Sequence, residues 1–219
     1  MITVRNHLSD KVRLGIITAR NIKPGKRPAR FESLLNSTIE KRRHPLSEQD
    51  DLFRKACRDM LRIGSYKPTG RGKPASEYLL RAALEDSFPV INPVADINNY
   101  ISLNRLIPIS LWDLDKIEAG SWLFRPGKEK EEFIFNASGQ TIGLSDLATG
   151  FAIADGQEVP VVTPVKDCQL TKTDDRTRNI AVALYYPAHW KGEPGLPEIV
   201  EEFSELLSEI SETVENRII

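Results

Sequence analysis

The sequence predicts an α+β protein, because its apolar residues follow a helical period in the first half and form short strand-like runs in the second. From about residue 107 onward, runs rich in branched and aromatic residues alternate with polar turns. Helices mostly followed by strands are typical of the α+β class. With 219 residues, 40% of them hydrophobic, the chain can bury a full core, and we expect a single domain over residues 1–219.

The N-terminal part is predicted to form one strand and three helices. Residues 12–18 alternate as a strand does, and residues 31–43 have helical spacing. Ser47, with an acidic residue three positions later, is a capping signal for a second helix that we expect to end at Gly64. A third helix should follow the loop 64–74 and bury Tyr78, Leu79, Ala82 and Ala83.

A fourth helix is predicted over residues 93–104, with Asn92 as its N-cap and Pro93 at its first position. Its inner face should carry Val94, Ile97 and Ile101. Strands are then predicted in seven runs: IPISLW, SWLF, EFIF, TIGL, FAIA, VPVVT and NIAVALYY. From Pro197 to Val214 an apolar stripe predicts a terminal helix with an acidic outer face. That helix either docks on its own domain or binds a partner.

Charge is divided unevenly along the chain. Residues 1–90 hold 19 of the 30 Lys and Arg residues but only 10 of the 31 Asp and Glu residues, so their net charge is +9. RNA is a natural partner for such a surface, because neutralising phosphates releases counterions. The predicted RNA contacts are Arg42, Arg43, Arg58, Lys67, Arg71 and Lys73. A solvated surface, balanced by the acidic half of the chain, explains the same counts equally well.

Several classes of protein lack sequence support. The motifs GxSxG, GxxxxGK[ST] and GxGxxG after a strand are missing, and the three histidines have no metal-ligand spacing. We therefore expect no metal and no cofactor. Cys57 and Cys168 lie among apolar neighbours and are interpreted as inert buried thiols. Without a membrane-spanning run or an N-terminal signal, we expect a cytoplasmic protein with no membrane partner.

Residues 90–120, VINPVADINNYISLNRLIPISLWDLDKIEAG, resemble a segment of bacterial phenylalanyl-tRNA synthetase β subunits. In that family, INNVVDITNYVM is followed at the same spacing by GQPxHAFDLDKL. The matching residues are Ile91, Asn92, Val94, Asp96, Ile97, Asn99 and Tyr100 in the first block, and Pro108, Asp113, Leu114, Asp115 and Lys116 in the second. Weaker similarity continues downstream, so the resemblance covers about 90–187.

The resemblance implies a B3/B4 domain, the α+β unit at which this synthetase hydrolyses tyrosine misattached to its tRNA. It implies a mixed β-sheet core with flanking helices over residues 90–187. A strand and a basic helical part (1–89) would precede this core, and a loop and an acidic helix (188–219) would follow it. A complete tRNA ligase is not expected, because the ATP-using domain belongs to the other subunit of that enzyme.

The chain departs from the family pattern at three pocket positions: Asn98 replaces a threonine, Ser110 a histidine and Ala183 a glutamate. Hydrolysis of tyrosine from phenylalanine tRNA is therefore expected to be weak or absent. Another polar pocket for a small amino-acid-like ligand is predicted, at which Asn98 and Ser110 meet. Its expected contacts are Asn98, Pro108, Ser110, Thr163 and Ala183. Helix capping is an equal alternative for Asn98 and Asn99.

Three functions stay open at this point. The first is a freestanding B3/B4-type tRNA- or RNA-binding domain connected with aminoacyl-tRNA quality control. The second is a trans-acting aminoacyl-tRNA deacylase, an ester hydrolase with altered amino-acid specificity. The third is a small-metabolite-binding protein that reuses the pocket. The basic N-terminal part favours the first two.

Overall fold

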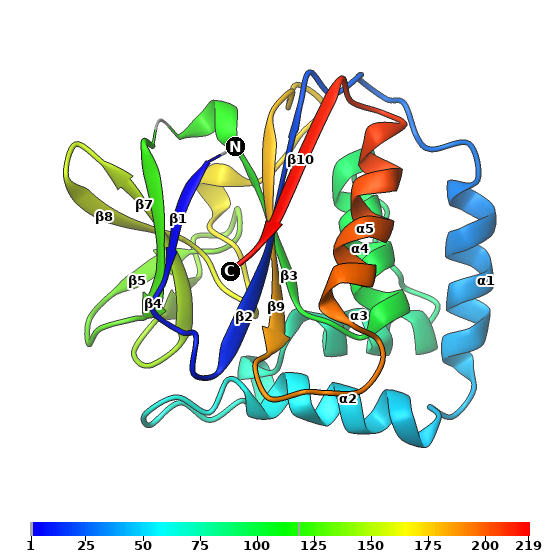
Figure 1. Cartoon of the computed structure of the whole chain (residues 1–219), viewed down its shortest axis with the longest axis horizontal. Coiled ribbons are helices and arrows are strands. Elements are labelled where there is room, and N and C mark those ends of the chain that lie inside the picture. Colours follow the sequence, from blue (N-terminus) through cyan, green and yellow to red (C-terminus); the bar gives the residue numbers. More distant parts are fainter. Residues whose placement is uncertain (1, 118) are drawn as a thin grey trace.

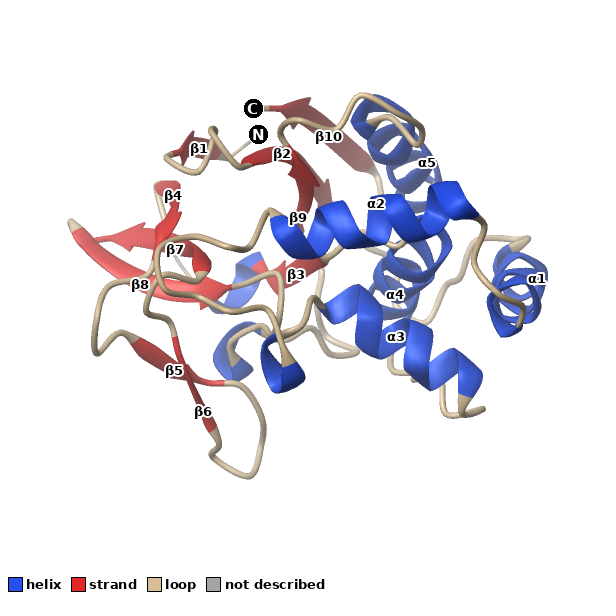
Figure 2. Cartoon of the chain, turned by 90° about the horizontal axis from the view of Figure 1, so that it is seen from below, coloured by secondary structure: helices blue, strands red, loops and turns tan. Residues whose placement is uncertain are grey.

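Two four-stranded sheets pack against each other, and helices cover the outer face of one of them (Figure 1). The structure is a computed structural model that describes residues 2–117 and 119–219. The helix-covered sheet has the order β10-β2-β9-β3, and the outer sheet has the order β1-β4-β7-β8. A small β5-β6 ribbon extends from the outer sheet (Figure 2). The α+β class is therefore confirmed.

Strands of the helix-covered sheet come from three distant parts of the chain. They are β2 (Val12–Arg20), β3 (Ile109–Asp113), β9 (Ile180–Pro187) and β10 (Thr213–Ile218). All neighbours in this sheet are antiparallel, and β3 and β10 are its edge strands. The B3/B4-like residues 90–187 thus share a sheet with segments from both ends of the chain.

The outer sheet is mixed, because β1 pairs with β4 in parallel and the other neighbours are antiparallel. Its strands are β1 (Thr3–Asn6), β4 (Ser121–Pro126), β7 (Ala148–Ala154) and β8 (Gln157–Val162). The ribbon consists of β5 (Glu132–Ile134) and β6 (Thr141–Gly143). All seven runs predicted as strands contribute to a strand, whereas β1 was not predicted.

The five α-helices of the described residues gather on one side of the molecule (Figure 2). They are α1 (Phe31–Arg43), α2 (Glu48–Asp59), α3 (Ala75–Leu84), α4 (Pro93–Arg105) and α5 (Leu196–Ser208). The predicted caps are confirmed: the Ser47 hydroxyl accepts a hydrogen bond from the Asp50 amide, and the Asn92 side chain accepts one from the Ala95 amide. Val94, Ile97 and Ile101 of α4 are buried in the core.

Three predicted details of the helices are wrong. Helix α2 ends at Asp59, before Gly64, and Tyr78 of α3 is 39% exposed instead of buried. The terminal helix ends at Ser208, and β10 then pairs antiparallel with β2. Ladder hydrogen bonds to the exposed edge of β2 override the helical spacing of the last apolar residues. Helix α5 packs on β2 and α4, so it docks on its own domain.

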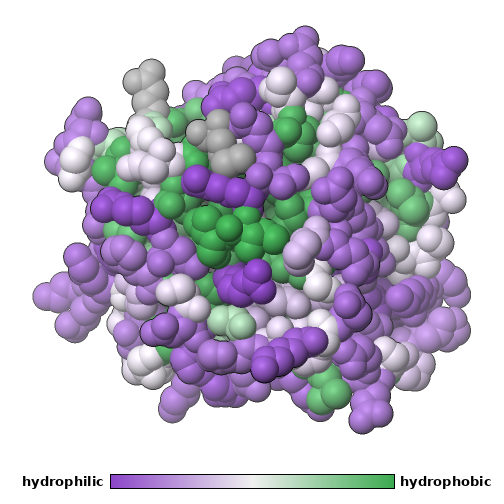
Figure 3. All heavy atoms as spheres, viewed as in Figure 1, coloured by the Kyte–Doolittle hydropathy of each residue, from purple (hydrophilic) through white to green (hydrophobic). Residues whose placement is uncertain are grey.

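The face of the molecule in Figure 3 is mostly hydrophilic, with apolar atoms gathered near its centre. That centre corresponds to the region between the two sheets where both chain ends lie in Figure 1. Ile2, Val4, Ile218 and Ile219, near the two ends of the chain, are partly buried and pack against the core. No described helix is long and apolar enough to cross a membrane.

Candidate functional site

A cavity of about 320 Å³ opens between α3, α4, the edge strand β3 and the turn 163–167 that follows β8. Its walls include Tyr78, Asn98, Ile109, Val165, Lys166 and Asp167, and we call it the Asn98 pocket. The walls combine apolar side chains with a few polar groups, as is typical of small-molecule sites.

Asn98 lies in the middle of α4 and contributes a buried amide to the pocket. The residue is 8% exposed, and its Oδ1 has no hydrogen-bond partner. Its Nδ2 makes one long hydrogen bond, 3.4 Å to Oδ1 of Asn99. The N-cap of this helix is Asn92, so the capping alternative for Asn98 does not hold. An unpaired buried carbonyl oxygen costs free energy, and it marks a place for a hydrogen-bond donor of a ligand.

Asp167 places a carboxyl group at the same pocket. Its Oδ2 accepts a hydrogen bond from the Leu111 amide at 3.2 Å, on the open edge of β3, whereas Oδ1 is buried and has no partner. Burial of the carboxyl raises the pKa of Asp167 to about 7, although the nearby Ser110 hydroxyl and the Leu111 and Thr163 amides favour its ionised form and lower the pKa. The group therefore titrates near neutral pH.

Thr163 shapes the turn that carries Asp167. Its hydroxyl donates a hydrogen bond to the Lys166 carbonyl at 2.7 Å and accepts from the amides of Val165 and Lys166 at 3.3 and 3.0 Å. These bonds close the turn and direct Lys166 and Asp167 to the pocket. Thr163 is thus a positioning residue and does not line the cavity.

Ser110 lies behind the pocket and not in its wall. It is 0% exposed, and its hydroxyl donates to the Thr163 carbonyl at 2.9 Å and lies 3.1 Å from the Tyr185 hydroxyl. Neighbouring residues of a strand point to opposite faces, so Ile109 faces the pocket while Ser110 faces the outer sheet. The expected pair of Asn98 and Ser110 is therefore corrected to Asn98 and Asp167.

Pro108 and Ala183 are also buried behind the cavity. The Pro108 carbonyl accepts a hydrogen bond from the Tyr185 amide at 3.1 Å. Ala183 is opposite Ser110 in the β3–β9 register and is 0% exposed. Both residues build the strand framework next to the pocket, and neither contributes to its wall.

Cations lie close to one wall of the Asn98 pocket, at Lys166. The Ala75 amide donates a hydrogen bond to the Pro164 carbonyl at 2.8 Å and so joins the end of loop 64–74 to the turn 163–167. Burial, followed by the charges of Arg71 and Lys172, lowers the pKa of Lys166, which indicates that the three cations are close. We call these three cations, together with Lys67 and Lys73 of the loop 64–74, the basic rim. No member of the rim forms an ion pair with a described residue.

The other predicted RNA contacts are engaged within the protein. Arg58 pairs with Glu77, and Arg43 pairs with Glu40 and Asp86. Arg42 is 2% exposed, so its predicted contact with a phosphate is wrong. The burial has a local cause: Arg42 falls on the inward stripe of α1, together with Phe31, Leu35 and Thr38.

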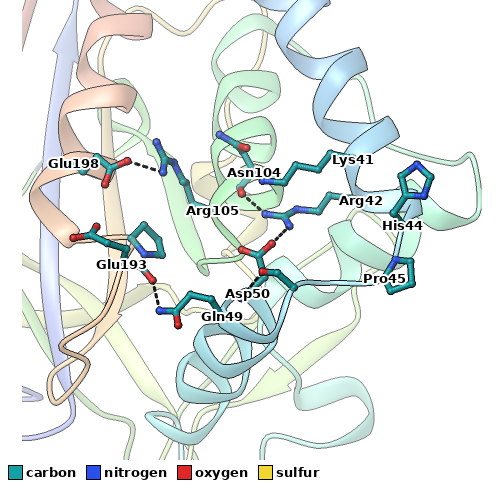
Figure 4. Close-up of a pocket in the computed structure, with 12 residues that line it drawn as sticks. Lys41, Arg42, His44, Pro45, Gln49, Asp50, Asn104, Arg105, Glu193 and Glu198 are labelled. Atoms are coloured by element: carbon teal, nitrogen blue, oxygen red, sulfur yellow. Dashed lines mark hydrogen bonds and ion pairs between the residues drawn. The ribbon is translucent and has the colours of Figure 1, made fainter.

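Arg42 borders a second cavity, of about 740 Å³, between the C-terminal ends of α1 and α4 and the N-terminal ends of α2 and α5 (Figure 4). Its guanidinium donates to Asp50 at 2.6 Å and to the carbonyls of Leu103 and Asn104. Across the cavity, Arg105 pairs with Glu198 at 2.7 Å. These charges neutralise one another, and no described residue that lines this cavity has a buried side-chain nitrogen or oxygen atom without a hydrogen-bond partner.

Asp167 and Lys166 are the pocket residues that the sequence did not single out. They follow Thr163 in the segment VPVVTPVKD, where the Gly-rich turn of the resembled family has no counterpart. That local departure from the pattern is the signal that points to them. No group of three His, Cys, Asp or Glu residues in the described part of the chain can hold a metal ion.

Comparison with known proteins places the chain in a family. The B3/4 domain family matches residues 66–190, more than half of the sequence. The phenylalanine–tRNA ligase β subunit of Bartonella henselae is 31% identical over 93 residues, which are 42% of this chain and 11% of that protein. An N-terminal fragment of the Pyrococcus horikoshii phenylalanyl-tRNA synthetase β subunit aligns with 99% of this chain and 50% of its own, with a TM-score of 0.48 and 11% identity.

The chain belongs to the B3/4 domain family. It spans about one tenth of the curated relative that it matches. The matched residues include α3, α4, β3 and the turn 163–167, and therefore the whole Asn98 pocket.

Proposed function

We propose that this B3/4 protein binds tRNA or a related RNA, with the end of the RNA at the Asn98 pocket. The observation that carries the proposal is the basic rim, whose cations have no carboxylate partner among the described residues and lie beside a cavity with unpaired acceptors. Lys and Arg side chains of this kind bind phosphates, and a neighbouring pocket can hold a terminal group.

The family supports an RNA partner. The matched relative is named as the β subunit of a tRNA ligase, an enzyme that acts on tRNA. A role in aminoacyl-tRNA quality control and a cytoplasmic location belong to the same proposal. Among the described groups that the sequence nominated for RNA, Lys67, Arg71 and Lys73 are the ones on the loop 64–74, whose end is joined to the pocket turn by the Ala75–Pro164 hydrogen bond.

Ester hydrolysis is the less favoured alternative. Ser110 and Ala183 stand where the resembled family has a histidine and a glutamate, and both are 0% exposed. The Ser110 hydroxyl is already engaged with Thr163 and Tyr185. A binding function therefore fits the arrangement better than tyrosine-specific deacylation does.

Charge reversal of the rim tests the proposal. The variant Lys67→Glu, Arg71→Glu, Lys73→Glu is expected to bind uncharged tRNA at least about tenfold more weakly in 0.1 M salt. The slope of log K against the logarithm of the salt concentration should become shallower by about 2 to 3, because counterions are no longer released at the lost phosphate contacts. Fluorescence anisotropy with labelled tRNA over a salt series measures both quantities.

A matched control uses the basic loop at the opposite end of the molecule, between β2 and α1 (Figure 1). Lys23→Glu, Lys26→Glu, Arg30→Glu makes the same change of charge at exposed positions. Wild-type affinity is expected for this control. Equal losses of tRNA affinity in the two variants would show that net charge, and not the rim, determines RNA binding. Unchanged affinity in both variants would refute the proposal.

A further inference from the structure

The β10 edge of the helix-covered sheet is the least protected sheet edge among the described strands. The opposite edge of the same sheet, β3, is capped by the Asp167 carboxylate, which accepts a hydrogen bond from the Leu111 amide. In the outer sheet, β1 has only four residues, and β8 contains Pro160 and pairs with an irregular register. Strand β10 has six residues, none of them proline, glycine or lysine, and it pairs with β2 in a regular register. Proteins usually block such an edge, so an open one indicates a partner strand.

Every second residue of β10 directs its backbone groups away from β2. Ile219 and Leu14 exchange two backbone hydrogen bonds, at 2.9 and 2.8 Å. Bonded and non-bonded pairs alternate along an antiparallel ladder, so Glu215 and Arg217 also bond to β2. The residues between them have their amide and carbonyl groups on the open edge, where no described residue bonds to these groups. These outward residues are Val214, Asn216 and Ile218.

The β10 edge belongs to the face of the molecule that Figure 3 shows. Strand β10 lies in front of β2 in Figure 1, and it lies with both chain ends at the top of Figure 2. Apolar atoms gather near the centre of this face, and Val214 and Ile218 are only partly buried. A strand added to β10 would therefore cover apolar surface as well as bond to the open backbone groups.

We propose that β10 pairs antiparallel with β10 of a second copy of this chain, about a two-fold axis at Asn216. Such an axis places the residue before Asn216 opposite the residue after Asn216 in the other copy. Glu215 then lies opposite Arg217 of the second copy, and symmetry repeats this pair. Val214 lies opposite Ile218 of the second copy, so apolar side chains also meet. Opposite charges and apolar pairs at facing positions stabilise antiparallel strands.

Charge distinguishes this register from its neighbours. An axis at Glu215 would place two carboxylates opposite each other, and an axis at Arg217 would place two guanidinium groups opposite each other. Like charges at facing positions destabilise a strand pair. The order Glu-Asn-Arg is therefore self-complementary only about its central residue, which favours a second copy of the chain over an unrelated strand.

Arg217 has donors left for a carboxylate of the second copy. Its Nη2 donates to the Ile2 carbonyl at 2.6 Å, and its Nε makes no hydrogen bond to a described residue. A guanidinium has five N–H donors, so the contact with Ile2 leaves others available. The dimer joins the two helix-covered sheets at β10 and leaves β3, with the Asn98 pocket, at the far edges. The inference is therefore independent of RNA binding.

Sedimentation equilibrium of the full chain without RNA, over a range of protein concentrations, measures the dimer. The wild type is expected to approach the mass of two chains as its concentration rises. Asn216→Pro removes an outward N–H but no bond to β2, and it should raise the Kd of the dimer at least about tenfold. Asn216→Ala is the matched control. It also loses the 3.0 Å hydrogen bond to Ser204 but keeps the backbone N–H, so it should dimerise as the wild type does.

Charge reversal tests the register. Glu215→Arg and Arg217→Glu each place like charges opposite each other in a symmetric dimer, so each should raise the Kd at least about tenfold. A mixture of these two variants should dimerise again, because one carries two cations and the other two anions at the facing positions. A wild type that is monomeric at every concentration, a dimer that Asn216→Pro leaves intact, or a mixture that stays monomeric would overturn the proposal.

Discussion

Replacing Arg42 by methionine is expected to lower the free energy of unfolding by about 3 kcal/mol. The side chain is 2% exposed and joins three helices, because it extends from α1 to Asp50 of α2 and to the last carbonyls of α4. Methionine fills much of the volume but leaves those two carbonyls and the Asp50 carboxylate without their donor. Urea unfolding followed by circular dichroism measures the loss.

Arg43→Met is the control for this prediction. Arg43 is the next residue of α1, but its side chain is 46% exposed and its ion pairs with Glu40 and Asp86 are on the surface. Exposed ion pairs contribute little to stability, because water screens the charges. Similar losses for the two variants would contradict the structural role assigned to Arg42.

Replacing Asp167 by asparagine is expected to raise the free energy of unfolding above that of the wild type, and to raise it more at pH 8 than at pH 4.5. The folded-state pKa, about 7, is above the usual value for an aspartate, so the folded protein holds the proton more tightly than the unfolded chain does. Stability is therefore lost as the pH rises from about 4 to about 7. Asparagine cannot ionise and removes this loss, which is about 2 to 4 kcal/mol for such a shift.

Asp115→Asn is a control with the opposite sign. Burial raises the pKa of Asp115, but hydrogen bonds from the Asn179 side chain and from the Arg178 and Asn179 amides outweigh it and lower the pKa. Its ionised form thus stabilises the fold at every pH above about 4, so the variant should be less stable than the wild type by a similar amount at pH 8 and at pH 4.5. An equal difference in unfolding free energy between wild type and Asp167→Asn at the two pH values would contradict the raised pKa assigned to Asp167.

A stabilising substitution at this position has a functional meaning. Natural proteins retain costly buried charges where a ligand needs them, so gains in stability at a site are commonly accompanied by losses of binding. The variant Asp167→Asn is therefore expected to be more stable at pH 8 and weaker in binding a ligand of the Asn98 pocket. That combination distinguishes a binding residue from a structural one.

Local signals predicted much of the fold. The capping residues Ser47 and Asn92 and the short apolar runs place helices and strands correctly, because they act within a few residues of the chain. Strand β10 was missed, since Val214 continues the helical spacing of α5 and only pairing with distant β2 makes it a strand. Tertiary contacts decided this segment, not its local pattern.

Less of the candidate site than of the fold could be predicted from the sequence. Asn98 was found through the family resemblance, but Ser110 faces the other side of β3, and Asp167 acquires its properties from burial next to an edge strand. The run KRRH resembles a solvated basic cluster, yet Arg42 falls four residues after Thr38 on the buried stripe of α1. Helical spacing could have identified this residue as internal.

Amide hydrogen exchange with and without uncharged tRNA tests most directly whether the basic rim and the Asn98 pocket form the RNA site. We expect slower exchange in the loop 64–74, at the start of α3 and in the turn 163–167, and no change in the loop between β2 and α1. Protection centred on residues 41–50 and 193–198, around the Arg42 cavity, would contradict the account, as would the absence of any protection at tRNA concentrations that saturate binding.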